Sequence, residues 1–406
     1  MNEQKREVKL MNEGKRPPLS SYRWVILGII ALMDMISNYV QFQISALATQ
    51  IMPALHISQA QFSSLLMAPM LVAVFLSIPS GMLADKFGAK RVVTVGCIVS
   101  VIGAYGRLVA HNFISMMLML MLFGIYMALL NANTIKIFST WFKQDTNIAM
   151  GIFFASASVG ITLSQLTSSL FASVNAAYLF SSTVLLVLTV LWIIFVKDTP
   201  KGEVVPKGEP VTKYLKIVVK SKKTWLVGIS GGIGSAATMS FTGILPQALI
   251  NGKAIAVASA GAIASVATIG SLIGSLVAPA VTHKLNRAKP FMVLTRIVAA
   301  ISIFITWFMP AGGLMVTNLV IGGLFGAANG PLMQGMVAEF PEIGSKYAGS
   351  AGGLVGTVQL LLSYVVTVAI SAIAGQNYLI TFAIQAILTA STMVFILLLP
   401  DANHVQ

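Results

Sequence analysis

Twelve apolar runs, each of about 20 residues or more, constrain what this chain can fold into. A helix of about 20 apolar residues spans the hydrocarbon core of a bilayer, which is about 30 Å thick. Charged residues make up only 9% of the 406 residues and hydrophobic residues 56%, whereas about 25% of the residues of a soluble domain are charged. The sequence therefore predicts an all-α membrane protein, with transmembrane helices at roughly 23–49, 61–84, 92–110, 114–138, 147–171, 176–196, 224–249, 255–281, 290–310, 313–337, 346–374 and 378–399.

The positions of the basic residues predict the orientation of these helices. Lysine and arginine concentrate in the N-terminal segment and in every second connection, whereas the other connections carry almost none beyond Lys253. Cytoplasmic loops hold the excess of such residues, so we expect a multi-pass protein of the cell membrane with both termini cytoplasmic. The net charge of +14 does not indicate nucleic acid, because the cations lie in loops rather than on one exposed face. Membrane lipids are the expected partners of these cations.

The longest connection, 197–223, separates two sets of six runs. Its second part alternates apolar residues with lysines at helical spacing, which fits either an amphipathic helix on the inner leaflet or a solvated linker. We therefore predict a tail at 1–22, a six-helix bundle at 23–196, a linker at 197–223, a second six-helix bundle at 224–400 and a tail at 401–406.

The two sets of runs share an internal repeat. Asp85 aligns with His283 at an offset of 198 (283 − 85 = 198). Three further pairs fall at the same offset: Asn131 with Asn329, Lys136 with Gln334, and Phe142 with Phe340. Such a repeat predicts two pseudo-symmetric bundles related by an axis along the membrane normal.

The connection between the second and third runs carries a dense motif at residues 81–91, GMLADKFGAKR. It resembles the loop between the second and third helices of major facilitator superfamily transporters. The matching positions are Gly81, Leu83, Asp85, Lys86, Gly88, Lys90 and Arg91. We expect Gly81 to allow close approach of a neighbouring helix and Gly88 to adopt a positive φ.

The resemblance implies the superfamily fold and a role for this loop in gating. The predicted gate residues are Gly81, Asp85, Lys86, Gly88 and Arg91. Asp85 is expected near the start of the eleventh helix, around residues 345–349, where the positive end of the helix dipole favours a carboxylate.

Polar residues in the first run predict a functional face. Asp34, Ser37, Asn38, Gln41 and Ser45 fall within an arc of about 100° on a helix. Asp34 lies about 16 Å from Arg23 along this helix, near the bilayer midplane. A carboxylate at that depth indicates either a wet cavity or an interhelical hydrogen-bond cluster. In the superfamily the first, fourth, seventh and tenth helices line the cavity, which implies the first alternative.

We therefore predict Asp34 as the proton-coupling residue. The predicted substrate-binding residues are Asn38, Gln41, Asn131, Asn133, Lys136, Asn329 and Gln334. A snorkelling lysine at the membrane interface is the alternative for Lys136. Arg107 is interpreted as structural, and Arg296 and Glu339, near predicted cytoplasmic ends, as interface or gate residues.

The sequence contains no metal-ligand cluster, nucleophile elbow or phosphate-binding loop, so we expect neither an enzyme nor a bound cofactor or metal. Leu120 stands where proton-coupled drug exporters of the superfamily usually carry arginine. By contrast, residues 133–152 resemble the same region of anion porters. We predict a monomeric, proton-coupled transporter of a small organic anion. The alternatives are a proton-coupled cation or multidrug antiporter anchored by Asp34, and a receptor that binds a solute without moving it.

Overall fold

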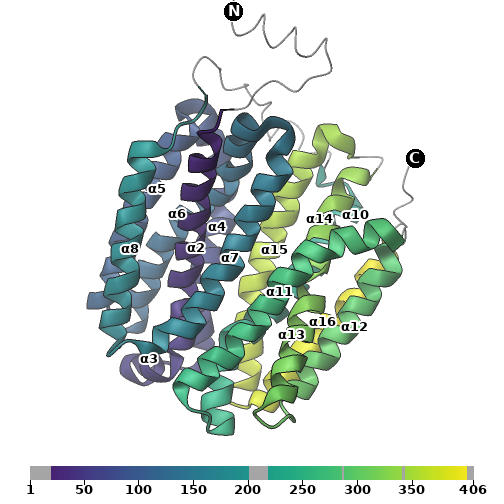
Figure 1. The fold of residues 1–406 in the computed structure, drawn as a ribbon. Helices are drawn as coiled ribbons and strands as arrows, with labels where there is room; N and C mark the ends of the chain where they lie inside the picture. Colours follow the sequence, from purple (N-terminus) through teal and green to yellow (C-terminus); the bar gives the residue numbers. More distant parts are fainter. Residues whose placement is uncertain (1–19, 201–217, 286–287, 341–342, 400–406) are drawn as a thin grey trace, which may run out of the picture.

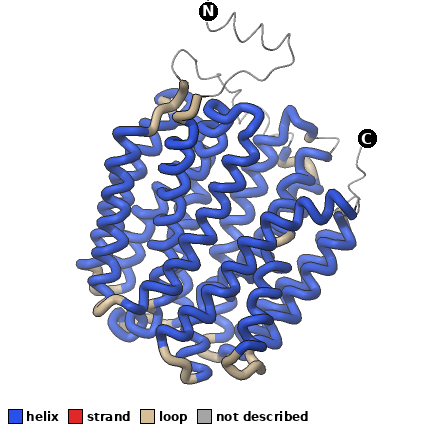
Figure 2. Tube along the Cα trace, viewed as in Figure 1, coloured by secondary structure: helices blue, strands red, loops and turns tan. Residues whose placement is uncertain are grey.

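The computed structural model describes residues 20–200, 218–285, 288–340 and 343–399. Within these ranges the regular secondary structure is helical, and twelve helices are long and apolar enough to cross a membrane. Figure 2 shows the helices and the loops that join them. Most of the predicted tails, residues 201–217 of the predicted linker at 197–223 and most of its amphipathic segment lie outside the described residues.

The first bundle contains six long helices and one short one (Figure 1). They are α2 (Arg23–Ala46), α3 (Ala48–Leu55), α4 (Gln59–Phe87), α5 (Ala89–Gly106), α6 (Phe113–Phe142), α7 (Thr146–Thr167) and α8 (Val174–Phe195). Side-chain caps fix several helix starts, because Ser58 and Asn112 each form a capping box with the residue three positions later. The short α3 is a separate helix that the sequence analysis did not predict.

The second bundle follows the same plan. It consists of α10 (Lys222–Gln247), α11 (Val257–Leu285), α12 (Ala288–Thr306), α13 (Gly313–Ala327), α14 (Asn329–Glu339), α15 (Gly344–Ala374) and α16 (Tyr378–Leu398). The tenth predicted span is thus two helices that meet at Ala328. Pro331 explains the break, because its nitrogen cannot donate to the carbonyl of Ala327.

The predicted repeat is visible in the helix bounds and in the packing. Shifting the start of α4 by 198 residues gives the start of α11 (257 − 59 = 198). The contacts repeat as well, since α2 packs on α7 as α10 packs on α15, and α4 on α6 as α11 on α13. The prediction of two pseudo-symmetric six-helix bundles is confirmed.

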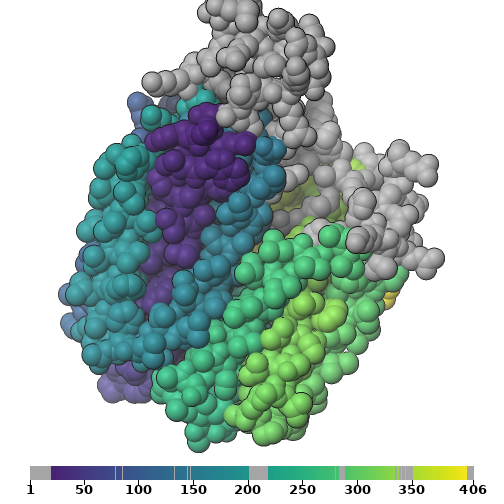
Figure 3. Space-filling view, in the orientation of Figure 1, coloured from purple at the N-terminus to yellow at the C-terminus, as the bar shows by residue number. Residues whose placement is uncertain are grey.

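The bundles meet along two seams, α4 against α15 and α7 against α11. In Figure 1, α2 begins at the upper end of the molecule, and α7 and α11 lie side by side toward the lower end. The same two helices diverge toward the upper end, where α15 is visible between them (Figure 1). The space-filling view also shows the two bundles in contact over their lower parts (Figure 3).

Candidate functional site

Hydrogen bonds between the two bundles gather in the lower part of the helices. Ser45 Oγ donates to the carbonyl of Gly243 over 2.6 Å, and the Gln59 and Gln247 amides exchange hydrogen bonds of 3.2 and 3.0 Å. Two further contacts lie on the seams, Ser63 with Ser371 and Thr162 with Thr268, and Gln165 of α7 donates to the Thr242 carbonyl of α10. The lower end of the interface is therefore closed by polar contacts.

An apolar cluster lies across the interface. Phe42 of α2 and Leu66, Met67 and Met70 of α4 pack against Met239 of α10 and side chains of α7 and α15. The α7 and α11 ribbons diverge toward the upper end (Figure 1), and the hydrogen bonds described between the bundles lie toward the lower end.

Asp34 lies in the middle of α2 with 4% of its surface exposed. Its carboxylate accepts hydrogen bonds from Asn38 Nδ2 at 3.3 Å and from Ser156 Oγ of α7 at 3.0 Å. Asn38 also donates to the backbone carbonyl of Asp34. The acid thus joins α2 to α7 through neutral partners.

The other polar residues of the α2 face are also buried and bonded. Ser37 donates to the Met33 carbonyl within α2, and Gln41 donates to the Leu66 carbonyl of α4 over 3.0 Å. Gln41 Oε1 is buried without a described partner. In this conformation the face makes interhelical hydrogen bonds, which is the second of the two alternatives that the sequence left open.

The predicted residues of the fourth and tenth spans do not form one cluster. Asn133 joins α6 to Ser80 of α4 over 2.8 Å, and Asn329 donates to the Met292 carbonyl of α12 over 3.1 Å. Each asparagine thus ties together helices of its own bundle. Asn131 is exposed and Lys136 half-buried. The side chain of Gln334 lies outside the described part of the structure.

The loop motif agrees with expectation at Gly88 and differs at Gly81. Gly88 has a φ of 87°, as predicted. A Cβ on Gly81 would meet no atom within 4 Å, so the expected close helix approach at this glycine is wrong for this conformation. Lys86 and Arg91 are exposed at the upper end. The side chains of Asp85 and of residues 344–350 are not among those described.

The structure adds Asp198 to this loop. Asp198 follows α8, and its Oδ1 accepts a hydrogen bond of 2.6 Å from the backbone nitrogen of Lys90 in the first turn of α5. A carboxylate at a helix N-terminus is favoured by the free N–H groups and the dipole. A Cβ on Gly88 would lie only 2.9 Å from the other oxygen, so glycine at this position also makes room for the carboxylate.

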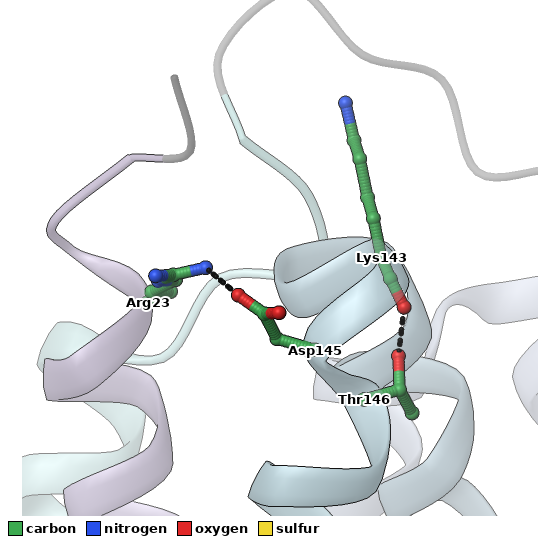
Figure 4. A network of polar contacts seen from close by, with 4 residues as sticks. All are labelled: Arg23, Lys143, Asp145 and Thr146. Atoms are coloured by element: carbon green, nitrogen blue, oxygen red, sulfur yellow. Dashed lines mark hydrogen bonds and ion pairs between the residues drawn. The ribbon is translucent and has the colours of Figure 1, made fainter. Parts of the chain in front are cut away.

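A second set of polar contacts holds the upper end of the first bundle together. Arg23 Nη1 at the start of α2 contacts Asp145 Oδ2 over 3.0 Å, and Asp145 belongs to η2 (Lys143–Asp145). Figure 4 shows this pair beside the hydrogen bond from Thr146 Oγ1 to the Lys143 carbonyl. This ion pair lies within one bundle, so it fixes α2 to the start of α7.

Arg107 is buried in the lower part of the first bundle with 1% of its surface exposed. Its guanidinium donates to the Ala104 and Val40 carbonyls, to Gln43 Oε1 and to Ser181 Oγ. It also lies 4.3 Å from the centroid of the Tyr178 ring. These contacts support the interpretation of Arg107 as a structural residue.

Arg296 is not where the sequence analysis placed it. It is the ninth residue of α12, about 12 Å along the helix, and it has 5% of its surface exposed. Nη1 donates one long hydrogen bond of 3.4 Å to the Gly326 carbonyl, and Nε is buried without an acceptor. The interpretation as a residue near the membrane interface is therefore wrong. Its place inside an otherwise apolar run was the signal for a buried role.

Arg296 lines a cavity of about 180 Å³ inside the second bundle. The walls come from α10, α12, the junction of α13 with α14, and α15. Met239 lines this cavity and also belongs to the apolar cluster between the bundles. The cavity therefore lies against the interface at which the bundles meet.

Two pseudo-symmetric six-helix bundles, with a cavity lined by a buried arginine beside their interface, form the architecture typical of secondary membrane transporters. The Major Facilitator Superfamily model matches residues 27–367. The chain belongs to this superfamily, as the loop at 81–91 indicated.

Similarities to individual proteins agree with this family. The nitrite extrusion protein of Bacillus subtilis (strain 168) is 24% identical over 321 residues, which cover 78% of each chain. A bacterial homologue of the human lysosomal transporter Spinster, in an inward-facing and unoccupied conformation, has a TM-score of 0.70 at 15% identity, with 94% of this chain and 96% of that chain covered. The nucleoside transporter NupG has a TM-score of 0.73 at 13% identity, with 91% and 98% covered. The two solved structures show the same fold, and the family indicates a multi-pass membrane transporter of small molecules rather than an enzyme.

Proposed function

We propose that this protein moves a small organic anion across the cell membrane by alternating access, coupled to protons at Asp34. In this proposal the upper end of Figure 1 is cytoplasmic, because the exposed Lys86 and Arg91 lie there. The hydrogen-bonded lower end then faces outward, and the structure represents an inward-facing state of a monomer.

The uncompensated charge of Arg296 carries the proposal of an anionic substrate. A guanidinium is charged at any physiological pH, and burying such a charge is costly unless other groups stabilise it. Arg296 has one long hydrogen bond, and among the described residues no carboxylate lies within ion-pair distance of it. An anion in the cavity would supply the missing negative charge. The similarity to a protein named for nitrite extrusion supports an anion as well.

Asp34 supports the proton-coupling part of the proposal. Among the described residues it is the acid buried within a membrane-spanning helix, and it bridges α2 and α7. Movement that separates Ser156 from Asp34 would change the environment of the carboxyl group, so that it binds a proton in one state and releases it in the other. The binding residues predicted from the sequence, Asn38, Gln41, Asn131, Asn133, Lys136, Asn329 and Gln334, and the predicted gate around Asp85 stay predictions on which this proposal does not depend.

Transport by purified protein in liposomes tests the function. Uptake of radiolabelled propionate, lactate and nitrite is measured with and without a pH gradient. We expect accumulation that depends on the gradient in wild type, and its loss in Asp34→Asn, with exchange of internal for external anion retained. Asp145→Asn is the matched control, because this acid lies at the upper end in an ion pair with Arg23. It should accumulate the anion like wild type.

Three results would contradict the proposal. Gradient-driven accumulation by Asp34→Asn would exclude Asp34 as the coupling site. Exchange of protons for organic cations, with no anion transport, would favour the antiporter alternative. Binding of an anion without any flux would favour the receptor.

A further inference from the structure

Two glycines on one face of α10 make room for the side chains of Arg296 and Gln359. A Cβ on Gly234 would lie 3.1 to 3.3 Å from the guanidinium nitrogens and carbon of Arg296. A Cβ on Gly231 would collide with the amide nitrogen of Gln359 from α15. Glycine inside a helix costs about 1 kcal/mol relative to alanine, so two glycines three residues apart need a reason. Here they allow one charged and one amide group to reach the same side of α10.

Two residues of the cavity lining each carry a buried polar atom without a described partner. Arg296 Nε is a donor without an acceptor, and Asn329 Oδ1 is an acceptor without a donor. Both residues line the cavity. Buried polar groups nearly always have a partner, so each exception calls for a ligand or water. A ligand that brings an anionic acceptor and a hydroxyl donor would satisfy both atoms.

The side chain of Arg296 is arranged for a planar anion. Nη1 is used by the Gly326 carbonyl, which leaves the edge formed by Nε and Nη2 for a carboxylate. Arginine binds carboxylates through two parallel hydrogen bonds of this kind. The neighbouring Gln359 supplies an amide, and Met239 and Met333 add apolar surface for a short hydrocarbon chain. The volume of about 180 Å³ compares with about 150 Å³ for a cavity that holds benzene.

We propose that the cavity lined by Arg296, Gln359 and Asn329 is the substrate site, and that it binds small monocarboxylates, with hydroxy-carboxylates bound more tightly than simple ones. This inference rests on the proposed function and deepens it. It assigns the substrate to the second bundle and the proton to Asp34 in the first. The transported anion then moves with one bundle while the other carries the coupling group.

Calorimetric titration of the full-length protein in detergent with propionate and lactate tests the site. We expect lactate to bind more tightly than propionate to wild type. Arg296→Gln should weaken both about 10- to 100-fold, because hydrogen bonds to a charged group are lost. The affinity of Arg296→Lys for each anion should lie between those of wild type and Arg296→Gln, because lysine keeps the charge and lacks the planar fork of arginine.

A second variant tests the cavity without touching the arginine. Gly330 lines this cavity, and a Cβ on it would meet no described atom within 4 Å, so Gly330→Leu adds an apolar side chain at the cavity wall. It should weaken binding at least about tenfold, in keeping with the loss of a bidentate charged contact, even if Arg296→Gln does not fold. Gly28→Leu, at an exposed and open position in the first bundle, is the matched control and should bind both anions like wild type.

The outcomes separate the site from the transport function. Wild-type binding in folded Arg296→Gln or in Gly330→Leu, or no binding of either anion to wild type, would overturn the site. Equal affinity for lactate and propionate would overturn the role of Asn329. If binding depends on Arg296 but liposomes show no anion flux, the site stands and the transport proposal fails. If flux is intact in Arg296→Gln, the site fails and the transport proposal stands.

Discussion

Arg107 in the first bundle and Arg296 in the second are both buried arginines, and they differ in what surrounds them. Arg107 has four hydrogen-bond acceptors and an aromatic ring. Arg296 has one long hydrogen bond, an unpaired Nε and a cavity beside it. A guanidinium with four of its five N–H donors used, as at Arg107, holds neighbouring helices together. A charge with an unused donor edge can bind a ligand, so the number of unpaired donors distinguishes the two roles better than burial does.

The largest expected effect is on the stability of the first bundle. Arg107→Met removes a guanidinium that joins α2, the end of α5 and α8, and leaves the Val40 and Ala104 carbonyls without this donor. We expect the free energy of unfolding to fall by about 2–6 kcal/mol, because each of these two buried carbonyls that loses its donor costs about 1–3 kcal/mol. Unfolding in mixed micelles of increasing denaturing detergent measures it. A loss below about 1 kcal/mol, typical of a single hydrogen bond, would mean that Arg107 is not structural and would break the comparison.

The same substitution in the second bundle should have a much smaller effect on stability. Arg296→Met replaces a poorly paired charge by an apolar chain of similar length, and such replacements of buried ions are often neutral or stabilising. We expect the free energy of unfolding to change by no more than about 1 kcal/mol, while anion transport is lost. Unfolding and liposome flux are measured on the same preparation. A destabilisation as large as that of Arg107→Met would assign Arg296 to structure as well.

The sequence predicted the fold because the bilayer dictates it. Local composition shows the runs that are long enough to span the membrane and the alternate connections that are rich in cations. The repeat at an offset of 198 residues is visible when the two halves of the sequence are aligned. Gly88 was predictable because a turn with positive φ between helices favours glycine. The break at Ala328 could also have been predicted, because Pro331 lies inside the tenth apolar run. It was missed because the apolar pattern continues across the break.

The candidate site was harder to predict, because it depends on groups that meet only in three dimensions. Arg296 was placed near an interface by its distance from the edge of a predicted run. Its Nε is unpaired because no described residue of the neighbouring helices offers it a hydrogen-bond acceptor. The spacing of residues in the sequence does not encode this. Asp198 was missed for the same reason, since it reaches Lys90 across the end of the bundle.

The smallest expected effect concerns Lys136, a half-buried cation near the upper end of α6. If the anion is held by the second bundle alone, Lys136 acts on it only through long-range attraction. Lys136→Gln should then weaken lactate binding by about threefold or less at low salt, which corresponds to less than about 1 kcal/mol. Raising the ionic strength from about 0.01 M to 1 M shortens the screening length from about 30 Å to 3 Å. The ratio of wild-type to variant affinity should therefore approach one at high salt for Lys136→Gln. For Arg296→Gln the difference in affinity from wild type should persist at high salt, because buried contacts are screened much less.

Calorimetric titration at both ionic strengths measures the two ratios. A ratio for Lys136→Gln that persists at high salt would mean that Lys136 contacts the anion directly. The site would then span both bundles, as the sequence analysis predicted, and the contrast between the bundles would no longer hold.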